Sequence, residues 1–130
     1  MHRLPNTQSV NRFRFAALLL LVKWLLIFGS AGLLGYSLWI GNRELTHLAI
    51  ILLGLAVLTM FLQWLVAARA RCPLCIGHPL AHKACATHRH TRRFFGSYRV
   101  YVAICVIFRG CFRCPFCGEP TAVEVRQRHP

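Results

Sequence analysis

The chain has 130 residues, 56% of them hydrophobic, and it carries 16 lysines and arginines against three acidic residues. This length allows one domain, or one small domain with a membrane anchor. The scarcity of acidic residues excludes a hydrolase that uses two carboxylates, and also a Mg²⁺ or Ca²⁺ site made of oxygen ligands. The net charge of +13 favours acidic partners, which are anionic lipid, nucleic acid or an acidic protein surface.

The first 40 residues combine a polar start with a long apolar stretch. Residues 1–14 are basic and contain Pro5, so we expect them to form a flexible cytoplasmic lead-in. Residues 15–40 are almost wholly apolar, with Lys23 as the charged interruption, and they provide the roughly 20 residues that a membrane span needs. We expect Lys23 to extend its ammonium group toward the nearer membrane surface.

A second apolar stretch, 45–68, follows a polar break at 41–44 and contains no formally charged residue. The two stretches predict a transmembrane helical hairpin over residues 15–68, with helices at about 15–40 and 45–68. A cleaved signal peptide is the alternative for the first stretch. It is disfavoured because the hydrophobicity continues well past any cleavage point.

Small and polar residues predict how the two helices pack. Gly29, Gly32 and Gly35 recur at every third position of the first stretch, and small residues allow helices to approach closely in lipid. We therefore expect these glycines to contact the second helix. Thr59 and Gln63 on the second stretch are the residues expected to form hydrogen bonds across that contact.

The basic residues beside the two stretches predict the orientation of the hairpin. Positive charges flank its outer ends, at Arg12 and Arg14 before it and at Arg69 and Arg71 after it, whereas the turn has a single arginine beside Glu44. The positive-inside rule then puts both termini in the cytoplasm. Cysteines on that side remain reduced and able to bind metal.

Residues 69–130 form the remaining cytoplasmic part. An apolar run over 100–108 is rich in valine and isoleucine, which favours a strand, although a three-turn helix beginning after Ser97 is the alternative. Residues 121–126 alternate in polarity, as a short edge strand would.

Two Cys-x-x-Cys motifs, Cys72–Cys75 and Cys114–Cys117, are the chemically informative feature of this part. Each motif places two thiolates close together, and two motifs supply the four ligands of one tetrahedral metal site. Gly118 directly follows the second motif, which suits a left-handed turn. Its counterpart after the first motif is displaced by one residue, to Gly77.

These Cys-Pro-x-Cys and Cys-Pro-x-Cys-Gly motifs resemble the paired knuckles of the zinc-ribbon superfamily, and the whole layout resembles small bacterial membrane proteins with two spans. The resemblance implies a small β-rich ribbon at 69–130 around one structural Zn²⁺, and a place for the hairpin in the inner membrane of a bacterium. Two alternatives use the same region. Iron in the four-cysteine site would make a rubredoxin-like electron-transfer protein, and Cys85 with His88 would change the ligands to three cysteines and one histidine.

The fold expected from the sequence is α+β, a two-helix transmembrane hairpin followed by a small β-rich zinc ribbon. Four thiolates leave no open metal position, so we expect a structural site, no enzyme activity and no small-molecule substrate. The expected function is that of an anchor or adaptor for a protein partner at the cytoplasmic membrane face, with membrane-tethered nucleic-acid binding as an alternative. The arginines expected to contact an anionic surface are Arg69, Arg71, Arg89, Arg92 and Arg93.

Overall fold

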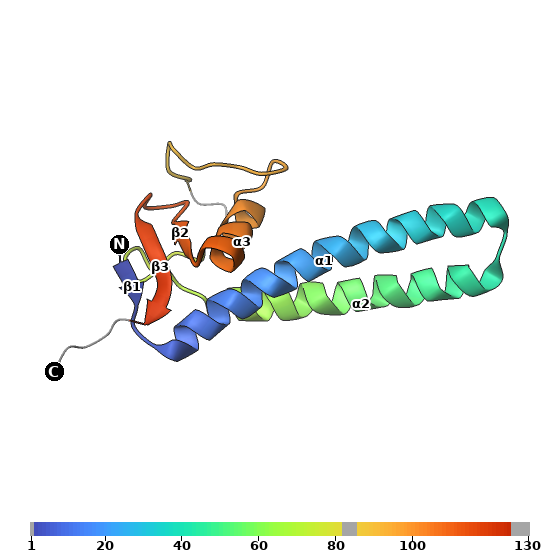
Figure 1. Ribbon diagram of the computed structural model, residues 1–130, viewed down its shortest axis with the longest axis horizontal. Coiled ribbons are helices and arrows are strands. Elements are labelled where there is room, and N and C mark those ends of the chain that lie inside the picture. The colour runs from blue at the N-terminus through green and yellow to red at the C-terminus, as the bar shows by residue number, and fades with distance from the viewer. Residues whose placement is uncertain (1, 82–85, 126–130) are drawn as a thin grey trace.

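The computed structural model describes residues 2–81 and 86–125. In chain order its elements are β1 (His2–Leu4), α1 (Thr7–Ile40), α2 (Arg43–Ala67), α3 (Tyr98–Arg109), β2 (Cys111–Arg113) and β3 (Pro120–Val125). Helices α1 and α2 form a long hairpin that projects from a compact module built by α3 and the three strands (Figure 1). The predicted α+β class with a helical hairpin is confirmed.

The hairpin carries most of its apolar side chains on its outer surface. The most apolar 18-residue windows of α1 and α2 are only 22% and 11% buried, and Trp39 is 90% exposed. The core helix of a soluble protein would bury such residues. Both helices are long and apolar enough to cross a membrane.

The contact between α1 and α2 uses a different set of residues from the predicted glycines. A Cβ atom added at Gly29, Gly32 or Gly35 would meet nothing within 4 Å, so the expectation that they contact α2 is wrong. From Lys23 onward, the buried positions on α1 recur every seven residues, at Lys23, Ser30 and Ser37. Three of the four buried positions on α2 have the same spacing: Ala49, Ala56 and Gln63. This spacing is that of a left-handed pair of helices in which small side chains allow close approach.

Lys23 lies inside the hairpin and does not extend outward as expected. Its Nζ atom donates a hydrogen bond to Oε1 of Gln63 over 3.3 Å, and Nε2 of Gln63 donates to the carbonyl oxygen of Leu80 over 3.4 Å. The inward position has a physical reason, because the facing helix supplies an acceptor at this depth. The predicted role of Gln63 is confirmed, whereas Thr59 donates only to the carbonyl of Ala56 in its own helix.

The N-terminal residues are part of the module core, and the expectation of a flexible lead-in is wrong. Leu4 and Phe13 are 1% and 0% exposed, and the ring of Phe13 lies 5.3 Å from that of Phe112 on β2. Helix α1 therefore begins at Thr7 instead of residue 15. The reason is that apolar residues occur among the basic ones at helical spacing, and the apolar face packs against α3 and β3.

The predicted strand over 100–108 is wrong, because this run belongs to helix α3. The helix follows Ser97, as in the alternative, although the Ser97 side chain makes no capping hydrogen bond, and it ends at Gly110 with a left-handed φ of 64°. Helix α3 buries Val102 and Val106 against α1 and the sheet. This tertiary contact outweighs the β propensity of valine and isoleucine.

Strand β3 confirms the predicted strand near 121–126, but the strand is central and not at an edge. The sheet order is β1-β3-β2, with β1 parallel to β3 and β2 antiparallel to it. Strand β3 becomes central because the N-terminal strand pairs with its free side. Residue 126 lies outside the described residues.

Candidate metal centre

The two Cys-x-x-Cys motifs fold into turns with the same hydrogen bonds, which we call the first knuckle (72–77) and the second knuckle (114–119). In the first knuckle, the N–H of Ile76 donates to the Cys72 carbonyl over 3.0 Å, and the Cys72 N–H donates to the Gly77 carbonyl over 2.8 Å. The corresponding bonds of the second knuckle run from Gly118 to Cys114 over 2.9 Å and from Cys114 to Glu119 over 3.0 Å. The two knuckles are therefore structural equivalents.

The knuckles bring four sulfur atoms together. The Sγ atoms of Cys72, Cys75, Cys114 and Cys117 all lie within 4.8 Å of one another, and those of Cys75 and Cys114 are 3.6 Å apart. Zn–S bonds of about 2.3 Å give a tetrahedron with sulfur–sulfur edges of about 3.8 Å. A disulfide would need about 2.05 Å, so this spacing fits four thiolates around one metal ion.

Hydrogen bonds between the thiols shift their protonation. A hydrogen bond between the Cys72 and Cys114 side chains lowers the pKa of Cys72 to about 5, with help from the backbone N–H groups of Cys75 and Leu74. The same bond and burial raise the pKa of Cys114, and burial raises the pKa of Cys117. Thiols that already share protons and accept backbone hydrogen bonds can exchange those protons for a cation, since metal-bound cysteine is deprotonated.

In the first knuckle an isoleucine, Ile76, occupies the position where the second knuckle has its glycine. Ile76 and Gly118 occupy the same position in their knuckles, and both have a left-handed φ, of 56° and 76°. Gly77 serves another purpose, because a Cβ atom there would lie 2.9 Å from the Phe116 ring and 3.2 Å from the Cys75 sulfur. The first knuckle therefore keeps the geometry of the second at the cost of an unfavourable isoleucine conformation.

His88 packs against the second knuckle and is not one of the clustered ligands. Its N–H donates to the Pro115 carbonyl over 2.6 Å, and its Nδ1 atom accepts from the His90 N–H over 3.3 Å. The His88 ring would lie 2.9 Å from a Cβ atom at Gly118. Among the described residues, the cluster contains cysteines alone, and Cys85 lies outside those residues.

No protein-family model matches the sequence, and comparisons with curated proteins and with solved structures returned no match. The geometry of the site is therefore what indicates its chemistry. Four thiolates suit a soft metal ion such as zinc or iron, and they leave no position for water or substrate. The arrangement can hold the two knuckles together, but it offers no open coordination site for a reaction.

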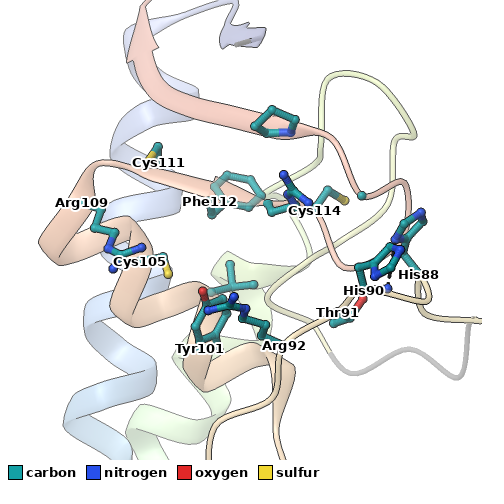
Figure 2. Close-up of a pocket in the computed structure, with 14 residues that line it drawn as sticks. His88, His90, Thr91, Arg92, Tyr101, Cys105, Arg109, Cys111, Phe112 and Cys114 are labelled. Atoms are coloured by element: carbon teal, nitrogen blue, oxygen red, sulfur yellow. Dashed lines mark hydrogen bonds between the residues drawn. The ribbon is translucent and has the colours of Figure 1, made fainter.

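A basic pocket of about 360 Å³ lies next to the second knuckle, between α3, β2 and the segment that carries His88 and Arg92 (Figure 2). Arg92, Arg109 and Arg113 line it together with two histidines, and within the described part of the chain no acidic residue does so. Tyr101 and Phe112 supply aromatic surface in the same pocket. Its composition is suited to a carboxylate or phosphate group.

The pocket includes one of the five arginines predicted to contact an anionic surface. Arg92 lines the pocket, whereas Arg71, Arg89 and Arg93 are exposed and lie outside it. Arg69 follows α2 and lines a different groove. Tyr101, Cys105 and Arg109 share one face of α3, and this spacing of four residues marks a common face only once the run is recognised as a helix.

Proposed function

We propose that the protein is a non-catalytic adaptor, anchored in the bacterial inner membrane with both termini in the cytoplasm, which offers a zinc-stabilised module to a protein partner. The observation that carries this proposal is the arginine-lined pocket beside the four-cysteine cluster. The pocket is joined to the hairpin through a continuous core that includes Phe13 and Phe112. A partner held in the pocket would therefore be held at a fixed place near the membrane.

Zinc is the metal we propose, in a structural role. The module outside the hairpin is small, and such modules commonly depend on a metal for part of their folding free energy. The two knuckles contribute Cys72 and Cys114 to the buried core, so losing the metal would loosen the module and the pocket together. Iron is the alternative, and it would support rubredoxin-like electron transfer. An absorption spectrum separates the two, because iron–thiolate sites are coloured and zinc sites are colourless.

An acidic segment of a protein partner is the ligand that we propose for the pocket. Three arginines without an opposing carboxylate favour a carboxylate ligand, since arginine can form paired hydrogen bonds with it. Membrane-tethered nucleic-acid binding is the second candidate, and the mixture of arginines with Tyr101 and Phe112 favours it in the same pocket. Nucleic-acid binding predicts retention on DNA or RNA that falls steeply as salt concentration rises.

The test is affinity purification of the intact protein from its own membranes after crosslinking. Arg92→Glu combined with Arg109→Glu reverses the charge of the pocket, and Arg89→Glu with Arg93→Glu makes the same change outside it. We expect one protein to crosslink to the unmodified chain and the control, and to be lost from the pocket variant. Equal recovery with both variants, or recovery of nucleic acid in place of protein, contradicts the adaptor proposal.

The orientation has its own test. A cysteine placed at Asn42, in the turn between α1 and α2, should react with a membrane-impermeant thiol reagent added to the outer side of the inner membrane. Labelling only after the membrane is opened contradicts the proposed orientation.

A further inference from the structure

A groove of about 730 Å³ lies where the hairpin joins the module, between the first part of α1 and the end of α2. Five residues supply its apolar surface: Phe15, Leu18, Leu62, Leu65 and Val66. All of them except Val66 are between 39% and 53% exposed. Gln8, Asn11 and three arginines supply its polar surface, and none of the described acidic residues lines it. The groove therefore combines an apolar floor, which a ligand could bury, with positive charge, which an anion could neutralise.

The two kinds of surface are separated along the groove. On α1, Arg12 and Arg14 precede Leu18, and on the antiparallel α2, Leu62 precedes Arg69. Because the two helices run in opposite directions (Figure 1), the three arginines lie toward the module and the leucines toward the turn between α1 and α2. The groove thus has a charged end and an apolar end.

The depth of the groove agrees with a membrane surface. A hydrocarbon layer of about 30 Å takes about 20 helical residues, and counting these from the turn between α1 and α2 puts its inner edge near Leu21 and Trp64. Leu62 then lies just inside that edge, and Leu18 lies about 4 to 5 Å outside it, at the level where the acyl chains join the lipid headgroups. Arg12 and Arg69 lie about 8 to 14 Å beyond it at about 1.5 Å per residue, and arginine side chains are long enough to reach back to lipid headgroups.

We propose that this groove binds one anionic phospholipid of the cytoplasmic leaflet. The phosphate group contacts Arg12, Arg14 and Arg69, and an acyl chain covers Leu18 and Leu62. Phosphate suits arginine because guanidinium groups form paired hydrogen bonds with it, and basic pockets between spanning helices favour anionic headgroups. The site deepens the proposed function, on whose orientation it rests, because a lipid held here would bridge the hairpin to the module.

The test is native mass spectrometry of the full chain in detergent, with phosphatidylglycerol and phosphatidylcholine of identical acyl chains as probes. The groove variant combines Arg12→Gln with Arg69→Gln. The matched control combines Arg89→Gln with Arg93→Gln, which removes the same charge from exposed positions outside the groove. A third variant, Leu18→Trp, fills the apolar end and leaves all charges in place.

We expect the unmodified chain and the control to retain one phosphatidylglycerol in preference to phosphatidylcholine. Removing two arginines should weaken retention about thirtyfold, since each basic residue beside anionic lipid contributes about fivefold. Leu18→Trp should also weaken retention of phosphatidylglycerol. Displacement of the lipid by millimolar inorganic phosphate would show a site for phosphate alone, and it would overturn the lipid assignment.

Three further results overturn the inference: equal retention of both lipids by the unmodified chain, equal loss in groove and control variants, and a dimer of the chain that retains no lipid. This experiment contains no protein partner, so a negative result would not contradict the adaptor proposal. That proposal is tested separately, by the charge reversals at Arg92 and Arg109. Conversely, loss of partner capture leaves the lipid result unchanged. Membrane fractionation of each variant confirms that the hairpin is still inserted.

Discussion

The left-handed conformation of Ile76 in the first knuckle determines whether glycine or alanine is the more stabilising substitution at that position. Ile76 has a φ of 56°, a conformation that costs an L-residue with a side chain roughly 1–2 kcal/mol. Glycine avoids that cost but loses about 0.5–1 kcal/mol through the greater freedom of the unfolded chain. At Ile76, glycine should therefore be more stabilising than alanine by about 0.5–1 kcal/mol. In an ordinary backbone conformation the order would be reversed.

Comparing Ile76→Gly with Ile76→Ala isolates this effect, because both substitutions remove the same side-chain atoms beyond Cβ. The assay is competition for the bound metal against a chelator, with the full chain in detergent. Since metal binding is coupled to folding of the module, the glycine variant should hold the metal about two- to fivefold more tightly than the alanine variant. A tighter alanine variant would show that the first knuckle does not have the geometry described.

The equivalent position in the second knuckle provides the reciprocal control. Gly118→Ala introduces the same left-handed strain, and its new Cβ atom would lie 2.9 Å from the ring of His88. We expect the metal affinity to fall by more than the strain alone explains. Adding His88→Ala should recover only the part due to the collision. If Gly118→Ala has no effect on metal retention, the equivalence of the two knuckles is refuted.

Three further predictions concern the core and the ligands. Gln63→Leu leaves the buried Lys23 ammonium group without its acceptor and should lower stability by about 1–3 kcal/mol, seen as a lower melting temperature in detergent, whereas adding Lys23→Met should restore most of it. Phe13→Ala should cost about 3–5 kcal/mol and expose the module to protease, because Phe13 is fully buried in its core; a module that stays resistant would show that α1 is not part of that core. Cys72→Ser should abolish the bound metal measured by elemental analysis, and Cys105→Ser should leave one metal ion per chain; equal loss in both variants would contradict the ligand assignment.

The features that the sequence predicted are those with a local signal. Two apolar stretches separated by a short polar break indicate a helical hairpin without further information. Two Cys-x-x-Cys motifs indicate one four-ligand site, because each motif fixes two thiols within a single turn. The sulfur cluster formed by Cys72 and Cys114 with their partners bears out this reasoning.

The features that the sequence did not predict depend on contacts between distant segments. Strand β1 is ordered because it pairs with β3, and the first turns of α1 are ordered because Phe13 packs against Phe112. The basic N-terminal segment contains no local sequence signal for either of these contacts. The valines of α3 have strand propensity, which packing on α1 overrides. The helix contact did carry a signal, the seven-residue spacing of Lys23, Ser30 and Ser37, but the three-residue glycine spacing concealed it.

The positions of the arginines also required the fold. Arg69 lines the same groove as Arg12 only because α1 and α2 are antiparallel, and Arg92 lines the same pocket as Arg109 only because the 88–92 segment lies next to α3. The sequence shows that the chain is basic, but it does not show that some of its arginines line two separate concave surfaces. Separate surfaces allow lipid and partner to be tested independently.

X-ray absorption spectroscopy at the metal edge of the purified full chain tests the central claim, that Cys72, Cys75, Cys114 and Cys117 bind one metal ion as a closed structural site. We predict zinc with four sulfur neighbours at about 2.3 Å and no lighter ligand. A nitrogen neighbour at about 2.0–2.1 Å would point to a histidine ligand, and either that result or a chain without stoichiometric metal would contradict the account.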